Sequence, residues 1–160
     1  MDMISIRHRN LPHWEMRGAT YFVTFRLQYP MHQYAVLSPT ERSTVKQAIL
    51  FWHEKRWRVH VLTVMPDHVH ILATPLETGI VDRYRLSDIL QSVKGYSARS
   101  INESRGRKGK FWQTESFDRI VRDQAEYDEK ATYILNNAIK KGLIEDGWEY
   151  DGFWCDAAHW

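Results

Sequence analysis

Two β-rich runs near the middle of the chain constrain its fold more than any other feature. They cover residues 59–64 and 69–74, and only residues 65–68 separate them. Runs rich in β-branched residues favour strands, and so short a connection is typical of a β-hairpin. We therefore expect two neighbouring strands at the centre of the molecule.

The segments on either side of this hairpin alternate between strand and helix periodicity. From residue 20 to residue 28, Tyr21, Val23, Phe25 and Leu27 occupy alternate positions, which predicts a strand with one buried face. Ser38 then supplies a helix N-cap, followed by a first-turn proline, a capping-box glutamate and apolar residues at helical spacing. A second amphipathic helix is expected over residues 86–101, despite the glycine at position 95 inside it.

The last third of the chain predicts a short strand and a final helix. The strand covers residues 117–121, and the helix begins at Asp123, with Glu126 in its first turn, and ends near Gly142. The resulting order is β-α-β-β-α-β-α. We expect an α+β fold: a ferredoxin-like split βαββαβ unit whose antiparallel sheet carries both main helices on one face, with the C-terminal helix beside the sheet.

Length and composition indicate one folded unit. The chain has 160 residues and no internal repeat or long linker, so we expect a single domain over residues 1–160. No apolar stretch reaches the roughly 20 residues of a membrane span and no signal peptide is apparent, which favours a cytoplasmic protein without a membrane partner. Cys155 is the only cysteine, so a bound metal would need His, Asp, Glu or Asn ligands.

Residues 144–160 form an acidic, aromatic tail. This segment contains no Lys or Arg; its acidic residues are Glu145, Asp146, Glu149, Asp151 and Asp156, and its aromatic residues include Trp148, Tyr150, Phe153, Trp154 and Trp160. Its charge predicts that it avoids DNA phosphates directly. One hypothesis is that it folds back over the domain or the site and regulates access of DNA.

Two histidines on the second strand of the hairpin are the first candidate for chemistry. His68 and His70 are two positions apart, so both side chains project from the same face of a strand and can chelate one divalent cation. The alternative is that one histidine fills a polar niche and the other faces solvent. The remaining histidines, His8, His13, His32, His53, His60 and His159, lack such a partner and are interpreted as structural.

Tyr133 and Asn137 in the last helix are the second candidate. They are one turn apart and share a face that is rotated by roughly 120° from the centre of the apolar stripe, so Tyr133 is not an obvious core residue. The alternative is an amphipathic tyrosine at the edge of the core with its hydroxyl in water, an interpretation that fits Tyr127 better. Asn136 is interpreted as a solvated polar residue.

A basic segment, residues 94–110, is the candidate for DNA binding. It holds six basic residues and one acidic residue, and aromatic side chains lie near it. Cations that neutralise phosphates, with rings that stack on bases, are typical of single-strand binding. The candidate contacts are Lys94, Arg99, Arg107, Lys108, Lys110 and Trp112. Alternatively, Phe111 and Trp112 cover the edge of the sheet and the basic loop is merely solvated.

Several blocks of sequence, in order, resemble one family across nearly the whole chain. They are residues 12–14, 21–26, 65–70, 92–99, 111–113, 117–119 and 133–143. In these blocks the chain is similar to the REP-associated tyrosine transposases, a branch of the HUH single-tyrosine transposases of bacterial insertion sequences. It departs from the family at Ala138, where a proline usually follows the asparagine.

The resemblance implies a DNA endonuclease and strand transferase. Tyr133 would attack DNA to give a 5′-phosphotyrosine and a free 3′-hydroxyl, and His68 and His70, with Asn137 as a third ligand, would hold Mg or Mn. The substrate would be single-stranded or hairpin DNA, with a short flanking tetranucleotide guiding the cut.

Two other functions stay open at this point. One is a non-catalytic hairpin-DNA-binding regulator with the same fold, and the other is a metal-dependent hydrolase that uses water as the nucleophile. The sequence also leaves open whether the protein is a monomer or a homodimer, and whether it moves DNA or processes repeated palindromes for its host.

Overall fold

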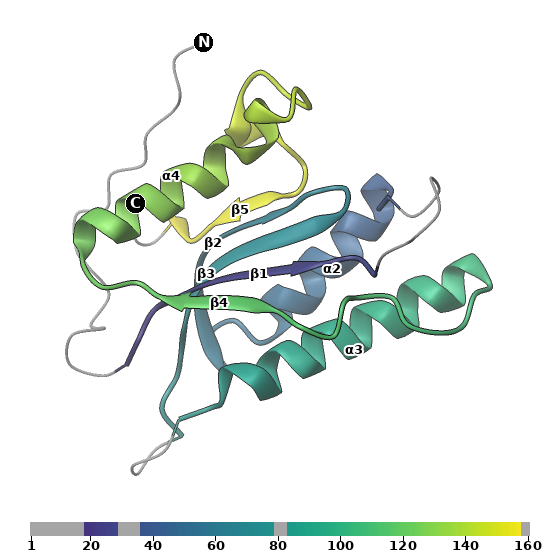
Figure 1. Ribbon diagram of the computed structural model, residues 1–160, viewed down its shortest axis with the longest axis horizontal. Coiled ribbons are helices and arrows are strands. Elements are labelled where there is room, and N and C mark those ends of the chain that lie inside the picture. The colour runs from purple at the N-terminus through teal and green to yellow at the C-terminus, as the bar shows by residue number, and fades with distance from the viewer. Residues whose placement is uncertain (1–17, 29–35, 79–82, 158–160) are drawn as a thin grey trace.

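A computed structural model describes residues 18–28, 36–78 and 83–157, and these residues form a five-stranded sheet with helices on both faces (Figure 1). The elements in chain order are β1 (Tyr21–Arg26), α2 (Pro39–Phe51), β2 (Trp57–Val64), β3 (His68–Pro75), α3 (Leu86–Arg105), β4 (Phe117–Ile120), α4 (Gln124–Lys140), the 3-10 helix η1 (Gly147–Glu149) and β5 (Phe153–Cys155).

The sheet has the order β4-β1-β3-β2-β5, and every neighbouring pair is antiparallel. The first four strands have the order predicted for the ferredoxin-like unit, and α2 and α3 cover one face, as expected (Figure 1). The α+β class and the C-terminal helix are therefore confirmed. The strand β5 was not expected, because its three residues carry too short a pattern to show a period.

The sheet separates two hydrophobic cores. Val23 and Phe25 of β1 belong to a core with residues of α2 and α3, whereas Phe22 belongs to a core with residues of α4. Helix α4 lies on the face of the sheet opposite α2 and α3 (Figure 1). The prediction that β1 has one buried face is therefore wrong, since α4 covers the face that the alternation left for solvent. The C-terminal helix was predicted to lie beside the sheet. In the structure, α4 lies across the face opposite α2 and α3.

The predicted helix ends are present. Ser38 and Glu41 form a reciprocal capping box at the start of α2. At α4 the Asp123 side chain accepts a hydrogen bond from the backbone of Glu126, and Gly142 adopts a φ of 71° just beyond the last turn. These local signals mark where α2 begins and where α4 begins and ends.

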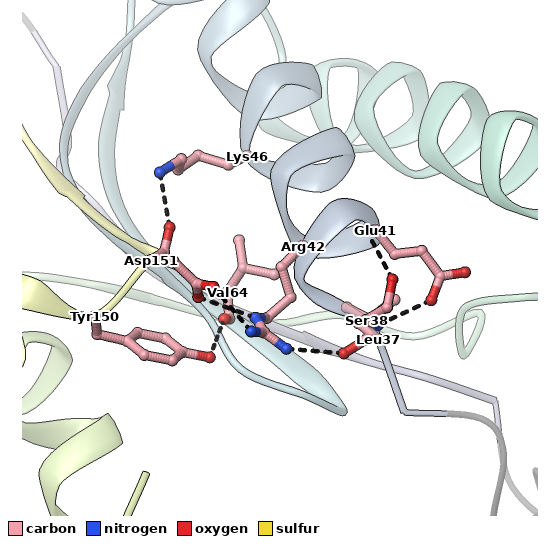
Figure 2. Close-up of polar contacts among 8 residues, drawn as sticks. All are labelled: Leu37, Ser38, Glu41, Arg42, Lys46, Val64, Tyr150 and Asp151. Atoms are coloured by element: carbon pink, nitrogen blue, oxygen red, sulfur yellow. Dashed lines mark hydrogen bonds and ion pairs between the residues drawn. The ribbon is translucent and has the colours of Figure 1, made fainter. Parts of the chain in front are cut away.

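The tail folds back and closes the free edge of β2. Strand β5 pairs with β2, and Figure 2 shows the preceding residues holding α2. The Arg42 side chain donates to both carboxylate oxygens of Asp151 at 3.2 and 3.0 Å, and Lys46 donates to the Asp151 carbonyl at 2.8 Å. The Tyr150 hydroxyl donates to the Val64 carbonyl at 2.8 Å. The tail is thus an integral part of the sheet, and the Asp151 charge is neutralised within the fold.

Among the described residues, no helix combines the length and apolar character that a membrane crossing requires.

Candidate active site

The two histidines of β3 project toward α4. Their neighbours Val69 and Ile71 belong to the core under α2 and α3, so the alternation of the strand directs His68 and His70 to the other face. Both imidazoles are buried, and their ring centroids are 4.7 Å apart. The predicted sharing of a face is therefore present.

Each imidazole is oriented by a neighbouring oxygen that contacts its Nδ1 atom. The Asp67 carboxylate accepts a hydrogen bond from His68 Nδ1 at 2.6 Å, and the Thr24 hydroxyl contacts His70 Nδ1 at 2.7 Å. Thr24 lies directly opposite His70 in the β1–β3 pairing. With Nδ1 engaged, the Nε2 atom of each ring is the one available to a ligand, which is the usual arrangement of metal-binding histidines.

Burial keeps both imidazoles neutral. Burial, together with the charge of the neighbouring His68, lowers the pKa of His70 to about 3, and burial is the larger effect. Burial also lowers the pKa of His68, although the Asp67 carboxylate partly offsets that effect. Neutral imidazole is the form that binds a cation, so both rings are ready to act as ligands near neutral pH.

Helix α4 brings Tyr133 next to the histidines and carries Asn137 one turn further along. The Tyr133 ring lies 5.2 Å from the His70 ring and 6.0 Å from the Phe22 ring, and the side chain is 38% exposed. Asn137, one turn further along, is buried. The structure thus brings His68, His70 and Tyr133 together on one side of the sheet, with Asn137 one helical turn from Tyr133.

The polar atoms of this cluster suit a divalent cation. His70 Nε2 and Asn137 Oδ1 are buried, and neither has a hydrogen-bond partner among the described residues. A buried polar atom without a partner is costly, and a bound ligand removes that cost. Imidazole nitrogens with an amide oxygen are donors that Mn²⁺ and similar cations accept, so the residues fit the implied metal.

Basic side chains surround the cluster, and they were not among the candidates predicted from the sequence. Arg26 lies opposite His68 in the β1–β3 pairing, and its charge lowers the pKa of both histidines. Lys130 Nζ lies 5.0 Å from the centroid of the Phe22 ring, and Lys140 Nζ lies 5.6 Å from that of Tyr133. These cations create a positive field that suits a phosphodiester. In the sequence, Lys130 and Lys140 could have been recognised by their helical spacing from Tyr133.

A second cluster, formed by His53, Glu54 and Asp156, has metal-binding residue types. The His53 nitrogen that faces the two carboxylates, however, carries a proton. His53 Nε2 lies 3.7 Å from carboxylate oxygens of Glu54 and of Asp156. The backbone N–H of Val59 donates to His53 Nδ1 at 3.0 Å, so in the neutral ring Nε2 carries the proton and has no lone pair for a metal. His53 instead links the tail to the corner between α2 and β2, in agreement with its structural interpretation.

Lys94, which is partly buried, and Trp112, which is buried, hold the loop after α3. Lys94 Nζ donates to the carbonyls of Gln113 and Thr114 at 2.7 and 3.3 Å. Trp112 is buried, and its indole donates to Ser97 Oγ at 3.0 Å. The interpretation of Trp112 as a base-stacking residue is corrected to the alternative, in which it covers the edge of the sheet, because a buried ring offers no face to a base.

The remaining basic candidates are exposed. Arg99, Arg107 and Lys108 are open to solvent, and Lys110, also exposed, donates to the Thr114 hydroxyl. A groove of about 930 Å³ on the α3 side is lined in part by Lys94, Lys110 and Trp112. The basic loop that follows α3 reaches the same end of the sheet as the histidines, because Gln28 pairs with Phe111 while Leu27 pairs with Asp67.

Two residues of α4 are more buried than expected. Asn136, interpreted as solvated, is fully buried, because η1 packs against α4 at Leu135 and widens the buried arc of the helix. Tyr127 is also fully buried rather than at the rim of the core, and burial raises the pKa of its hydroxyl. His8, His13, His32, His159 and the sequence block at residues 12–14 lie outside the described residues.

Comparisons with known proteins identify a family, a similar relative and a similar fold. The family model described as "Transposase IS200 like" matches residues 28–137. A Haemophilus influenzae protein that carries the name REP-associated tyrosine transposase is 25% identical over 152 residues, which cover 88% of this chain and 82% of the relative. A solved structure of a REP-associated tyrosine transposase bound to a REP hairpin has a TM-score of 0.65 at 20% identity, over 96% of this chain and 82% of that one.

Proposed function

The chain belongs to the IS200-like transposase family, and from that premise we propose that it cuts and rejoins single-stranded DNA through a covalent bond to Tyr133. The observation that supports this most is the position of the Tyr133 ring, 5.2 Å from the buried ring of His70 and partly open to solvent. A nucleophile needs access to the substrate and a cationic environment at the attacked phosphate, and this position provides both.

The proposed reaction exchanges one ester bond for another. The Tyr133 hydroxyl oxygen forms a bond to phosphorus while the bond from phosphorus to the 3′-oxygen breaks, which leaves a 5′-phosphotyrosine. The phenolic proton is lost, and the leaving 3′-oxygen takes up a proton to become a hydroxyl. A second strand's 3′-hydroxyl reverses these steps and releases Tyr133, so rejoining needs no ATP.

His68, His70 and Asn137 would hold a divalent cation, Mg or Mn, at this place. When bound, such a cation neutralises charge that develops on the phosphoryl oxygens. Thr24 and Asp67 keep the imidazoles in the orientation that presents Nε2. Arg26, Lys130 and Lys140 add positive charge around the phosphate.

We expect hairpin DNA as the substrate, because the structure of similar fold holds a REP hairpin. The exposed side chains of Arg99, Arg107, Lys108 and Lys110 are proposed to contact its backbone. Lys94 contributes by holding the loop that carries three of them in place.

A library of hairpins makes the test independent of the target sequence. The protein and its Tyr133→Phe variant are incubated with Mg²⁺ and labelled hairpins whose single-stranded flanks are randomised, and the products are separated on denaturing gels. We expect a covalent adduct with the unchanged protein only, and retained hairpin binding by the variant. Binding without an adduct from either protein would favour the non-catalytic regulator. Cleavage that persists in the variant would favour the hydrolase that uses water.

A further inference from the structure

Strand β4 forms one edge of the sheet and exposes an aromatic side chain beside the candidate active site. All four of its residues are exposed, and Phe117 is 59% exposed. A phenylalanine this exposed gains little stability from packing within the domain, so its ring is open to a ligand. The residues around it indicate the chemistry of that ligand.

The strand pairing places Phe117 in the same row as the histidine cluster. Phe117 lies opposite Thr24 in the β1–β4 pairing, and Thr24 lies opposite His70 in the β1–β3 pairing. Residues directly opposite one another in antiparallel strands project from the same face. Phe117 therefore lies two strand spacings, about 10 Å, from His70 on the face that carries Tyr133.

Positive charge flanks this row. Arg26 follows Thr24 on the same face of β1, and Lys130 lies over the ring of Phe22, which precedes Thr24 on that face. The opposite face of β4 presents Asp118 and Ile120, an acid and an aliphatic side chain. Within β4 itself, the one aromatic side chain thus lies on the face that also carries Arg26 and Lys130.

We propose that Phe117 is a stacking platform for a base of the single-stranded DNA next to the scissile phosphate. On this account, which rests on the proposed function, the strand crosses β1 and β4 with its phosphates near Arg26 and Lys130 and one base on the Phe117 ring. Rings beside cations are the usual means of binding single strands with tolerance for sequence, because every base has a π face. Phe117 is therefore a positioning residue that acts on the substrate outside the cluster of reacting groups.

The test compares two variants of Phe117 with two matched controls. Binding of a fluorescein-labelled oligothymidylate is measured by anisotropy in a Tyr133→Phe background, in which no covalent step intervenes. Phe117→Ala should weaken binding at least about fivefold, and Phe117→Trp should restore it. Ile120→Ala changes a side chain that is 49% exposed on the other face of the same strand, and Phe51→Ala removes a ring that is 58% exposed on α2. Both controls should bind like the parent protein.

A measurement on the protein without any change at Phe117 supports the comparison. An oligonucleotide that contains 5-iodouracil is photo-crosslinked, and the modified peptide is identified by mass spectrometry. We expect the crosslink at Phe117. Crosslinks confined to other positions, or equal binding by the parent protein and Phe117→Ala, would overturn the proposal.

The outcome is separable from that of the proposed function. If the protein with Tyr133 intact forms no adduct but oligothymidylate binding depends on Phe117, the nuclease proposal fails and the stacking surface stands. If adducts form while binding is insensitive to Phe117, the reverse holds.

Discussion

Thr24 and Asp67 engage Nδ1 of the two imidazoles and leave Nε2 as the nitrogen available to a ligand, and neither residue was among the sequence candidates. Thr24 is separated from His70 by more than forty positions and meets it only through strand pairing. The histidine pair itself could be found from its spacing, because alternation on a strand is a local property. Partners that meet through strand pairing have no such local signal.

At the residue scale we predict that Asp67→Asn and Thr24→Val weaken binding of Mn²⁺ by about tenfold to a hundredfold, since each removes a contact that orients a ligand. Isothermal titration calorimetry with Mn²⁺ and no DNA measures this directly. Asp118→Asn, which removes an exposed carboxylate from the other face, serves as the control and should leave affinity unchanged. Equal affinity in all of these proteins would show that the two oxygens do not orient the ligands.

At the scale of elements, α2 is joined to the end of α3 by an ion pair between Glu41 and Arg105. Both Glu41 carboxylate oxygens accept from the Arg105 guanidinium, and the Ser38 backbone adds a third contact. The hydrogen bond from Arg105 is the largest of the effects that lower the pKa of Glu41. A carboxyl group with a lowered pKa stabilises the fold above its unfolded pKa of about 4.3, and that stabilisation is lost as the pH falls through the folded pKa.

We therefore predict that Glu41→Gln lowers the free energy of unfolding by about 1 kcal/mol at neutral pH. In acid the two proteins should converge, because protonation of Glu41 removes the same ion pair from the parent. Urea unfolding curves at a series of pH values provide the measurement. A difference that stays constant down to the lowest pH would contradict this account of the ion pair.

Gly152, just before β5, makes a second prediction at this scale. A Cβ atom there would lie 2.2 Å from the Val64 carbonyl oxygen, so the tail can approach β2 only with glycine at this position. Gly152→Ala should destabilise the protein by about 1–3 kcal/mol, measured by urea unfolding.

The matched control for that change is Gly95→Ala within α3. A Cβ atom at Gly95 meets only an ordinary contact, 3.5 Å from Arg99, and alanine should instead stabilise the helix by about 0.5–1 kcal/mol. If the two substitutions shifted stability equally, the close approach of the tail to β2 would not be a constraint on the fold.

The elements themselves could be predicted wherever local chemistry marks their ends. The capping residues Ser38 and Asp123 and the short connection between the two central β-rich runs led to the observed helices and hairpin. Strand β5 could not be predicted, since three residues show no period and only the open edge of β2 makes them a strand. The burial of Asn136 could not be predicted either, because it depends on where the tail packs against α4.

At the scale of the whole molecule, positive charge near one end of the sheet is concentrated in two regions. Arg26, Lys130 and Lys140 surround the candidate active site, while the loop after α3 carries exposed cations at the same end of the sheet. Composition gives only a formal net charge of +2, which conceals this arrangement. The basic segment was visible in the sequence, but its separation into structural and exposed cations required the fold.

We predict that the double variant Arg107→Gln, Lys108→Gln weakens hairpin binding without changing the preferred sequence, because phosphate contacts carry no sequence information. The slope of log affinity against log salt should decrease in magnitude by about 2, as two fewer counterions are released from duplex DNA. Anisotropy titrations over a range of salt concentrations measure the slope, with Lys55→Gln on the α2 side as control. An unchanged slope in the double variant would exclude this loop from the DNA contact.

The central claim is that the phenol of Tyr133, beside the histidine pair, takes the 5′ phosphate of cleaved DNA. Mass spectrometry of the trapped protein–DNA adduct after nuclease and protease digestion tests it most directly, since it locates the residue that carries the nucleotide. We predict a 5′-phosphonucleotide on Tyr133. A nucleotide attached to any other residue, or a cleaved 5′ phosphate that is free of protein, would contradict the claim.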